Sequence, residues 1–368
     1  MRFWFRALAD IIAGPDTSLR AKLEGEVFGS TTRPSAFAIR IPDQPPVTLQ
    51  PFLPAVHRAR AGGWTAYLLG PRLATTRASG MDPIPHLSPG TVFDICLKSR
   101  GSESAESRMA LALASLWLAC AYGGVGARTH RGFGGLRIIA ADGPLPDPWT
   151  HQAVLSPGLS HYENIRRLWP AGPVGDCVPL LARLAAPHGG LPALAQWTSP
   201  PPYPVLSRTH TLVGTSGGGT FSTWADVAEY AGEQLRNFRT SGAARDAALE
   251  GAAAVARVVP TRDSARFPAG ALGLPVAYRD GDEINAYQDR IPLRRPSPLW
   301  LRPVGEAGHW RLLSYAFLGQ FLPGPNPPQV RLHHRGRPIR ELKVTDDDIV
   351  ALATRWITTL AADGTFIR

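Results

Sequence analysis

One sequence feature constrains the fold of this 368-residue chain more than any other. It is an uncharged, mostly apolar run that ends in a glycine-rich loop. Residues 109–127, MALALASLWLACAYGGVGA, carry no charged side chain and approach the length of a membrane span. Their alanines, glycines and serine make the run only weakly hydrophobic, and a single isolated span would be unusual here. We therefore expect a helix over 104–122 that is buried within a soluble core, and no membrane contact.

The loop that follows this helix does not fit the common nucleotide sites. Residues 123–135, GGVGARTHRGFGG, hold six glycines, two arginines and one histidine. Walker A loops and dinucleotide fingerprints place their glycines before a helix, whereas here the helix comes first. Because a helix C-terminus is the negative end of the dipole, affinity for anions must come from Arg128, Arg131 and backbone N–H groups arranged as a nest.

The charge of the chain favours a polyanionic partner. There are 39 basic and 29 acidic residues, a net charge of +10, and nearly all the basic residues are arginines. A GC-rich coding bias explains part of this excess but explains its clustering less well. Arginine also makes forked contacts with phosphates and stacks on bases.

A second basic region, residues 290–340, interleaves arginines with aromatic side chains. Its arginines and aromatics are Arg294, Arg295, Arg302, Arg311, Arg331, Arg335, Arg337, Arg340, Trp300, Trp310, Tyr315 and Phe317. Such a mixture is typical of a surface for single-stranded nucleic acid. It is equally typical of strands with an aromatic core and a solvated arginine rim, and we expect both to be partly true.

Periodicity predicts an α+β fold with antiparallel sheets. We expect helices over 1–14, 104–122, from 223 onward, and over 346–364. We expect strands over 35–41, 64–70, 91–97, 133–141, 272–284, 297–304 and 309–319. The acids Asp346, Asp347 and Asp348 are interpreted as the N-cap of the last helix rather than a metal cluster. A domain boundary is predicted at 142–149, giving domains 1–150 and 151–368, the second with a Pro-rich insertion.

The cysteines and the N-terminus indicate a cytoplasmic protein. Cys96, Cys120 and Cys177 are widely spaced, which suggests neither a disulfide framework nor a zinc site. Arg6 and Asp10 interrupt the first apolar run, so no signal-peptide pattern is present. We expect no metal and no cofactor.

His130 is the one loop side chain that titrates near neutrality, so it can serve as a general acid or base. Because the sequence identifies no partner nucleophile or carboxylate, base stacking or phosphate bonding is the favoured role. A metal-independent ribonuclease using His130 or His57 is the alternative function. A scaffold whose loop packs on a neighbouring subunit is a third.

Segment 122–138, YGGVGARTHRGFGGLRI, resembles the glycine-rich loop of the RAMP superfamily, the ferredoxin-like RNA-binding proteins of CRISPR effector complexes. RFWFRALA (2–9) with VFGS (27–30), GALGLPVAY (270–278) and RRPSPLWLRP (294–303) are similar to motifs of one family within it. That family is the first-numbered subunit of type III-B (Cmr) complexes, which has two RAMP domains.

The resemblance implies a structural, non-catalytic, RNA-binding subunit of a Cmr ribonucleoprotein in antiviral defence. Its partners would be the 3′ end of the guide RNA, the target RNA and other Cmr-type subunits. By motif, the RNA-contact candidates are Arg2, Arg6, Arg128, Thr129, His130, Arg131, Gly132, Phe133, Gly134, Arg294 and Arg295.

The resemblance also implies two ferredoxin-like (RRM-like) domains, with one departure. In the family a strand precedes the helix that bears RFWFRAL, whereas this chain begins at that helix. The first domain would then lack its first strand and expose a neighbouring edge. A start site placed too late, or a strand supplied by another chain, is favoured over a split or degenerate variant.

Overall fold

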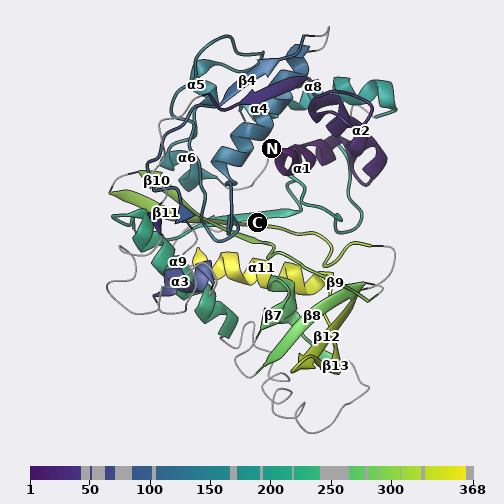
Figure 1. Ribbon diagram of the computed structural model, residues 1–368, viewed down its shortest axis with the longest axis vertical. Coiled ribbons are helices and arrows are strands. Elements are labelled where there is room, and N and C mark those ends of the chain that lie inside the picture. The colour runs from purple at the N-terminus through teal and green to yellow at the C-terminus, as the bar shows by residue number, and fades with distance from the viewer. Residues whose placement is uncertain are drawn as a thin grey trace.

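A three-stranded sheet crosses the middle of the molecule, with α1, α2 and α4 on one side and α9 and α11 on the other (Figure 1). This computed structural model describes residues 1–42, 50–51, 63–70, 85–101, 105–165, 172–190, 194–217, 219–240, 265–277, 281–288, 290–306, 308–324 and 328–361.

The first residues form two helices joined by a tight turn. α1 (Arg2–Ala13) confirms the predicted helix and buries Trp4 and Leu8. α2 (Thr17–Phe28) begins where the Asp16 carboxylate accepts hydrogen bonds from two backbone N–H groups, both at 2.9 Å. This cap fixes the angle at which α2 returns along α1.

α4 (Ala105–Ala121) confirms the buried helix predicted from the uncharged run. Most of its side chains from Ala110 onward are buried, so the helix is covered by protein on nearly every side. Within the described part of the chain, no helix has the length and apolar character that crossing a membrane requires.

Short strands and helices surround α4. β1 (Phe37–Arg40) confirms a predicted strand and pairs antiparallel with β4 (Cys96–Ser99), which takes up only the end of the predicted 91–97. β2 (Gln50–Pro51) pairs with β3 (Pro85–His86). The short helices are α5 (His151–Val154), α6 (Leu159–Asn164), α7 (Pro173–Asp176), α8 (Val178–Ala185) and the 3₁₀ helix η2 (Ala186–His188).

Two predicted strands are wrong. Residues 64–70 form α3 (Trp64–Leu69) instead. The Glu229 carboxylate accepts hydrogen bonds from the first N–H groups of this helix, at 2.8 and 2.9 Å, and so supplies a cap that no local pattern indicates. Residues 133–141 join no strand ladder, and Ile138 bonds with Ser156 at 2.8 and 3.0 Å instead.

The central sheet has the order β10–β11–β5 and is antiparallel throughout. β10 (Leu299–Glu306) and β11 (His309–Phe317) confirm the predicted strand pair, and β5 (Thr211–Thr215) adds the third strand. α9 (Trp224–Thr240) and α11 (Asp346–Leu360) also confirm predicted helices. Along the chain these elements follow the order strand–helix–strand–strand–helix.

α11 begins with a capping box, as the three consecutive acids predicted. The Thr345 hydroxyl accepts a hydrogen bond from the Asp348 N–H at 3.3 Å, and the Asp348 carboxylate accepts one from the Thr345 N–H at 2.8 Å. These acids therefore stabilise the helix start.

A six-stranded sheet, which sequence analysis did not resolve, lies beside the 3₁₀ helix η3 (Pro268–Leu272). Its order is β6–β13–β12–β8–β7, with β9 also paired to β8. The strands are β6 (Ala265–Arg266), β7 (Val276–Ala277), β8 (Asp282–Gln288), β9 (Ile291–Leu293), β12 (Gln329–His334) and β13 (Arg337–Lys343). The strand predicted over 272–284 is therefore interrupted, and Asp280 of its expected turn lies outside the described residues.

The central sheet separates two hydrophobic cores. Alternate residues of β10 and β11 point to opposite faces, as the pleat requires. Trp300 and Tyr315 pack with α1 and α4, whereas Leu301 and Leu312 pack with α9 and α11. The N-terminal half therefore completes its core with side chains from the C-terminal half.

Candidate nucleic-acid interface

The glycine loop (residues 123–135) folds back on itself and lies along β10. Its ends are joined by a hydrogen bond from the Val125 N–H to the Gly134 carbonyl at 2.8 Å. The Leu301 N–H donates to the His130 carbonyl at 3.1 Å, which fastens the loop to β10. A Cβ on Gly132 would lie 3.0 Å from Pro303 Cδ, so this glycine permits the close approach.

The C-terminus of α4 is covered by side chains from distant elements. A helix end leaves carbonyl groups without intrahelical partners. Arg302 of β10 donates to the carbonyls of Cys120, Gly123 and Leu136, the last at 2.9 Å. The Tyr162 and Tyr315 hydroxyls donate to the carbonyls that follow Cys120 in the chain. A buried cation at the negative end of the dipole thus anchors the start of the loop.

His130 is neutral and held by the protein. Its ring stacks on Trp300 with centroids 3.7 Å apart, and its Nδ1 hydrogen-bonds the Ser297 carbonyl at 3.0 Å. Burial, with a smaller effect of the Arg131 charge, lowers its pKa to about 4. A group with this pKa is a poor general acid at neutral pH, which weakens the nuclease alternative at His130. His57 lies outside the described residues.

The remaining loop groups serve the turn and the core. The N–H groups of Arg131, Gly132 and Phe133 donate to the Arg128 and Thr129 carbonyls, at 2.8 to 3.4 Å. These amides therefore do not form the anion nest that the sequence suggested. The Phe133 ring is half-buried and packs against the core shared with α9 and α11.

Arg128 and Arg131 are the loop's cations, and neither makes an ion pair with a described carboxylate. Arg128 is exposed and has a positive φ of 64°, a strained backbone for a non-glycine residue. Arg131 is half-buried, and burial first, then the charges of Arg239 and Arg128, lower its pKa to about 10. Two unneutralised guanidinium groups thus meet at the loop.

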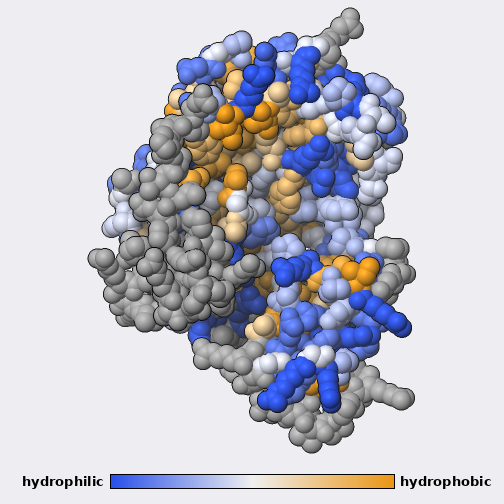
Figure 2. Space-filling view, viewed as in Figure 1, coloured by the Kyte–Doolittle hydropathy of each residue, from blue (hydrophilic) through white to orange (hydrophobic). Residues whose placement is uncertain are grey.

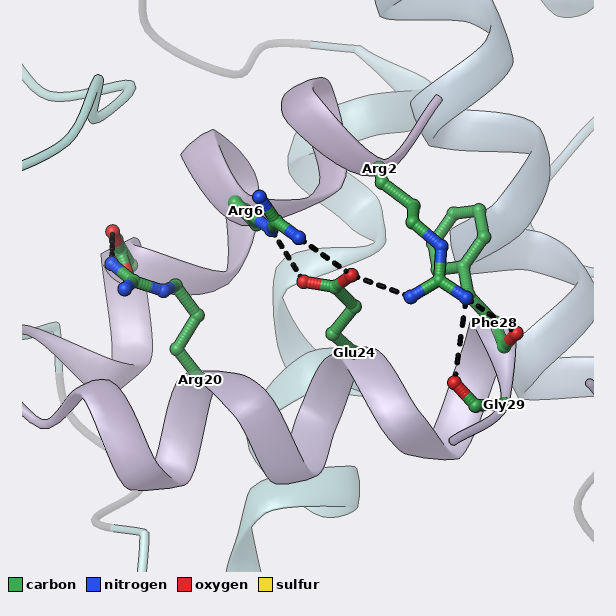
Figure 3. A network of polar contacts seen from close by, with 7 residues as sticks. Arg2, Arg6, Arg20, Glu24, Phe28 and Gly29 are labelled. Carbon is green, nitrogen blue, oxygen red and sulfur yellow. Dashed lines mark hydrogen bonds and ion pairs between the residues drawn. The ribbon is translucent and has the colours of Figure 1, made fainter. Parts of the chain in front are cut away.

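Arg2 and Arg6 form ion pairs with α2. Both reach Glu24, Arg2 at 2.6 Å and Arg6 at 2.5 Å, and their side chains remain 50% and 46% exposed. Figure 3 shows the two guanidinium groups converging on this one carboxylate, with Arg2 also donating to the Phe28 carbonyl at 3.0 Å. Their RNA contacts remain a prediction.

Arg294 and Arg295, the last predicted contacts, differ from each other. Arg294 is exposed. The Arg295 guanidinium donates to the carbonyls of Phe321, Ala271 and Pro296, the last two at 3.1 and 3.0 Å, and burial lowers its pKa to about 10. These bonds occupy the donors on its Nε and Nη1 atoms and give it a structural role.

In the second basic region the structure favours the interpretation of an aromatic core with an arginine rim. Trp300, Tyr315 and Phe317 are buried in the core, so they do not form a stacking surface for bases. Arg311 pairs with Glu163 at 2.7 Å. The exposed arginines lie mainly toward the six-stranded sheet, where Figure 2 shows a largely hydrophilic surface.

Comparisons with known proteins agree with this architecture. A family model described as the RAMP superfamily matches residues 1–137. This match covers the helices α1 and α2, α4 and the glycine loop, and so concerns the first part of the chain. The chain is 33% identical over 144 residues to the CRISPR system Cmr subunit Cmr1-1 of Pyrococcus furiosus, a match that spans 38% of each protein.

A solved structure is similar in fold over nearly the whole chain. The apo crystal structure of Cmr1 from Pyrococcus furiosus aligns with a TM-score of 0.51 at 20% identity, covering 96% of this chain and 86% of that one. At this identity the likeness concerns the fold. A chain of a type III-B Cmr-beta structure with cognate target RNA aligns with a TM-score of 0.44 at 11% identity, covering 98% and 91%.

Proposed function

We propose that the chain is an RNA-binding structural subunit of a type III-B CRISPR (Cmr) ribonucleoprotein. Its partners are the guide RNA, at the 3′ end, the target RNA and other Cmr-type subunits. The match of residues 1–137 to the RAMP superfamily model and the similarity to Cmr1 support this proposal. The observation that carries it is the pair of loop cations, Arg128 and Arg131, which no described carboxylate neutralises.

The architecture supports a two-domain RAMP protein. The succession β5, α9, β10, β11 and α11 has the connectivity of a ferredoxin-like domain without its last strand. We assign it to a second RAMP domain within 151–368, and residues 1–150 to the first.

Arginine-dominated binding gives RNA affinity a steep dependence on salt. Each phosphate that a guanidinium neutralises releases condensed counterions, and the log–log slope of affinity against salt falls by about 0.7 for each such contact with single-stranded RNA. Binding carried by bases alone would lack this signature.

The first prediction concerns the two loop arginines. In the purified chain, or in the assembled complex, Arg128→Ala and Arg131→Ala should each weaken binding to single-stranded guide RNA. Each should also reduce the salt slope by about 0.7, because each removes one phosphate contact. Fluorescence anisotropy across a salt series measures both quantities.

A matched control separates this effect from lost net charge. Arg355 lies exposed on α11, and Arg355→Ala removes the same charge from another surface. Its salt slope should equal that of the wild type. Unchanged affinity and slope in both loop variants would exclude the loop from the RNA site.

A further inference from the structure

The two-stranded sheet of β1 and β4 has an open edge along β4. At the end of the ladder, the Arg100 N–H donates to the Ala36 carbonyl at 3.0 Å. In an antiparallel pair only every second residue directs its N–H and C=O groups toward the partner strand. Counting back from Arg100, the backbone groups of Ser99 and Leu97 therefore point away from β1. Among the described residues, none forms a backbone hydrogen bond with them.

This edge of β4 is accessible from solvent. Cys96, Lys98 and Ser99 are exposed, and Leu97 is half-buried. Free N–H and C=O groups along an exposed strand are a template on which another strand can form a ladder. A strand added here would exchange bonds to water for bonds between backbones.

An apolar layer runs from the first core out to the same sheet. Phe37 is buried, whereas Ile39, on the same face of β1, is 50% exposed. Ile41 and Ile95 follow at the end of the ladder and are also exposed. Leu97 lies opposite Ile39 and is only partly covered by the core. Figure 2 shows hydrophobic surface in the upper part of the molecule, where Figure 1 places β4 and α4.

The opposite face of this sheet is basic. Arg40 and Lys98 alternate with the apolar residues of their strands, and Arg100 follows β4 directly; all three are exposed. A second copy pairing through the same edge would bring Lys98 close to its counterpart, and like charges on neighbouring strands repel. A strand with carboxylates on this face would gain attraction instead. The charge of the edge therefore favours an acidic partner over a second copy.

We propose that the outer edge of β4 receives a strand from another polypeptide, with apolar side chains on the face of Leu97 and acidic side chains on the face of Lys98. In the ribonucleoprotein proposed above this polypeptide is a neighbouring subunit, and that part of the inference rests on the proposed function. The added strand makes the sheet three-stranded and covers apolar side chains at its margin.

A labelled short peptide of alternating valine and glutamate tests the edge in the purified full chain. Ser99→Pro removes one outward N–H and leaves the bonds to β1 intact, because Ser99 does not donate to that strand. Ser99→Ala is the matched control, since it loses the same hydroxyl group and keeps the N–H. Fluorescence anisotropy should show equal peptide binding by the wild type and Ser99→Ala, and about tenfold weaker binding by Ser99→Pro.

Two altered peptides separate strand addition from other modes of binding. A valine–lysine peptide should bind the wild type at least about tenfold more weakly, because Lys98 and Arg40 repel it. N-methylation of alternate peptide bonds removes the donors of the added strand and should abolish binding. The proposal is overturned if the N-methylated peptide binds as tightly as its parent, or if the wild type binds none of these peptides.

Hydrogen exchange shows what covers the edge in the assembled protein. The amides of Leu97 and Ser99 should exchange rapidly in the isolated chain and become protected in the ribonucleoprotein. Rapid exchange in both states would exclude a subunit strand here, and slow exchange in the isolated chain would show an edge that is already covered.

Two further outcomes concern the identity of the partner. A dimer of the isolated chain in sedimentation, abolished by Ser99→Pro, would overturn the acidic partner in favour of a second copy. A chain that binds the valine–glutamate peptide through Ser99 but does not assemble with Cmr-type subunits would support the edge and refute the proposed function.

Discussion

His130 is held between Trp300 and the Ser297 carbonyl in a form that acid should disrupt. Its folded pKa of about 4 lies below the ordinary value of 6.5. The unfolded chain therefore binds a proton on this residue at higher pH than the folded chain does. The stabilisation is complete above about pH 6.5 and is lost as pH falls towards about 4.

We expect His130→Gln to remove this pH dependence. The stability advantage of the wild type over the variant should shrink by about 3 kcal/mol between about pH 7 and about pH 4, from the two pKa values. Urea unfolding of both proteins at each pH measures the difference, and taking the difference cancels other titrating groups. A difference that does not vary with pH would show that His130 is solvated rather than buried.

Single residues also show how far the sequence could specify the candidate site. The clustering of Arg128 and Arg131 could be predicted from the sequence, because the two residues lie three positions apart in one loop. The roles of Arg295 and Arg302 could not be predicted from the sequence. Some of the carbonyls to which they donate hydrogen bonds belong to segments far away in the chain.

Among the elements, α4 depends on Arg302 for its C-terminal carbonyls. Arg302→Met should destabilise the protein by at least about 3 kcal/mol, because buried carbonyls lose their donors and each unsatisfied group costs about 1–3 kcal/mol. Arg302→Lys should recover little of this, since one ammonium cannot span the three carbonyls. Equilibrium urea unfolding measures both losses.

Arg311→Met provides the comparison from the adjacent strand. Arg311 pairs with Glu163, a partly exposed carboxylate, and also donates to the Ser216 carbonyl at 2.8 Å. We expect this variant to lose roughly 1 kcal/mol. Equal losses in the free energy of unfolding for Arg302→Met and Arg311→Met would mean that the carbonyls at the end of α4 accept hydrogen bonds from water in the variant.

Helices were easier to predict than strands for a physical reason. The long helices α1, α4, α9 and α11 carry their own hydrogen bonds and display the apolar spacing that buries them. A strand needs a partner, and residues 133–141 have a strand-like sequence but no strand beside them. The strand predicted over 64–70 was wrong for the opposite reason, because these residues do have a partner elsewhere in the chain. A carboxylate from α9 caps them as the helix α3. The six-stranded sheet was missed because several of its strands have only two or three residues.

In the whole molecule, the two halves share a core across the central sheet. Trp4 of α1 packs against Trp300 and Tyr315, with ring centroids 5.8 and 6.4 Å away. Both partners lie beyond the boundary predicted at 142–149. Residues 1–150 on their own would therefore expose a large apolar surface to water.

We accordingly expect residues 1–150, expressed alone, to lack a cooperative unfolding transition and to bind a hydrophobic dye strongly. Co-expression with residues 151–368 should restore the near-ultraviolet circular dichroism of the full chain, because Trp4 regains its aromatic partners. Cooperative unfolding of the isolated fragment would instead show that each half folds alone. The loop lies on β10, so RNA binding should return only in the reconstituted pair.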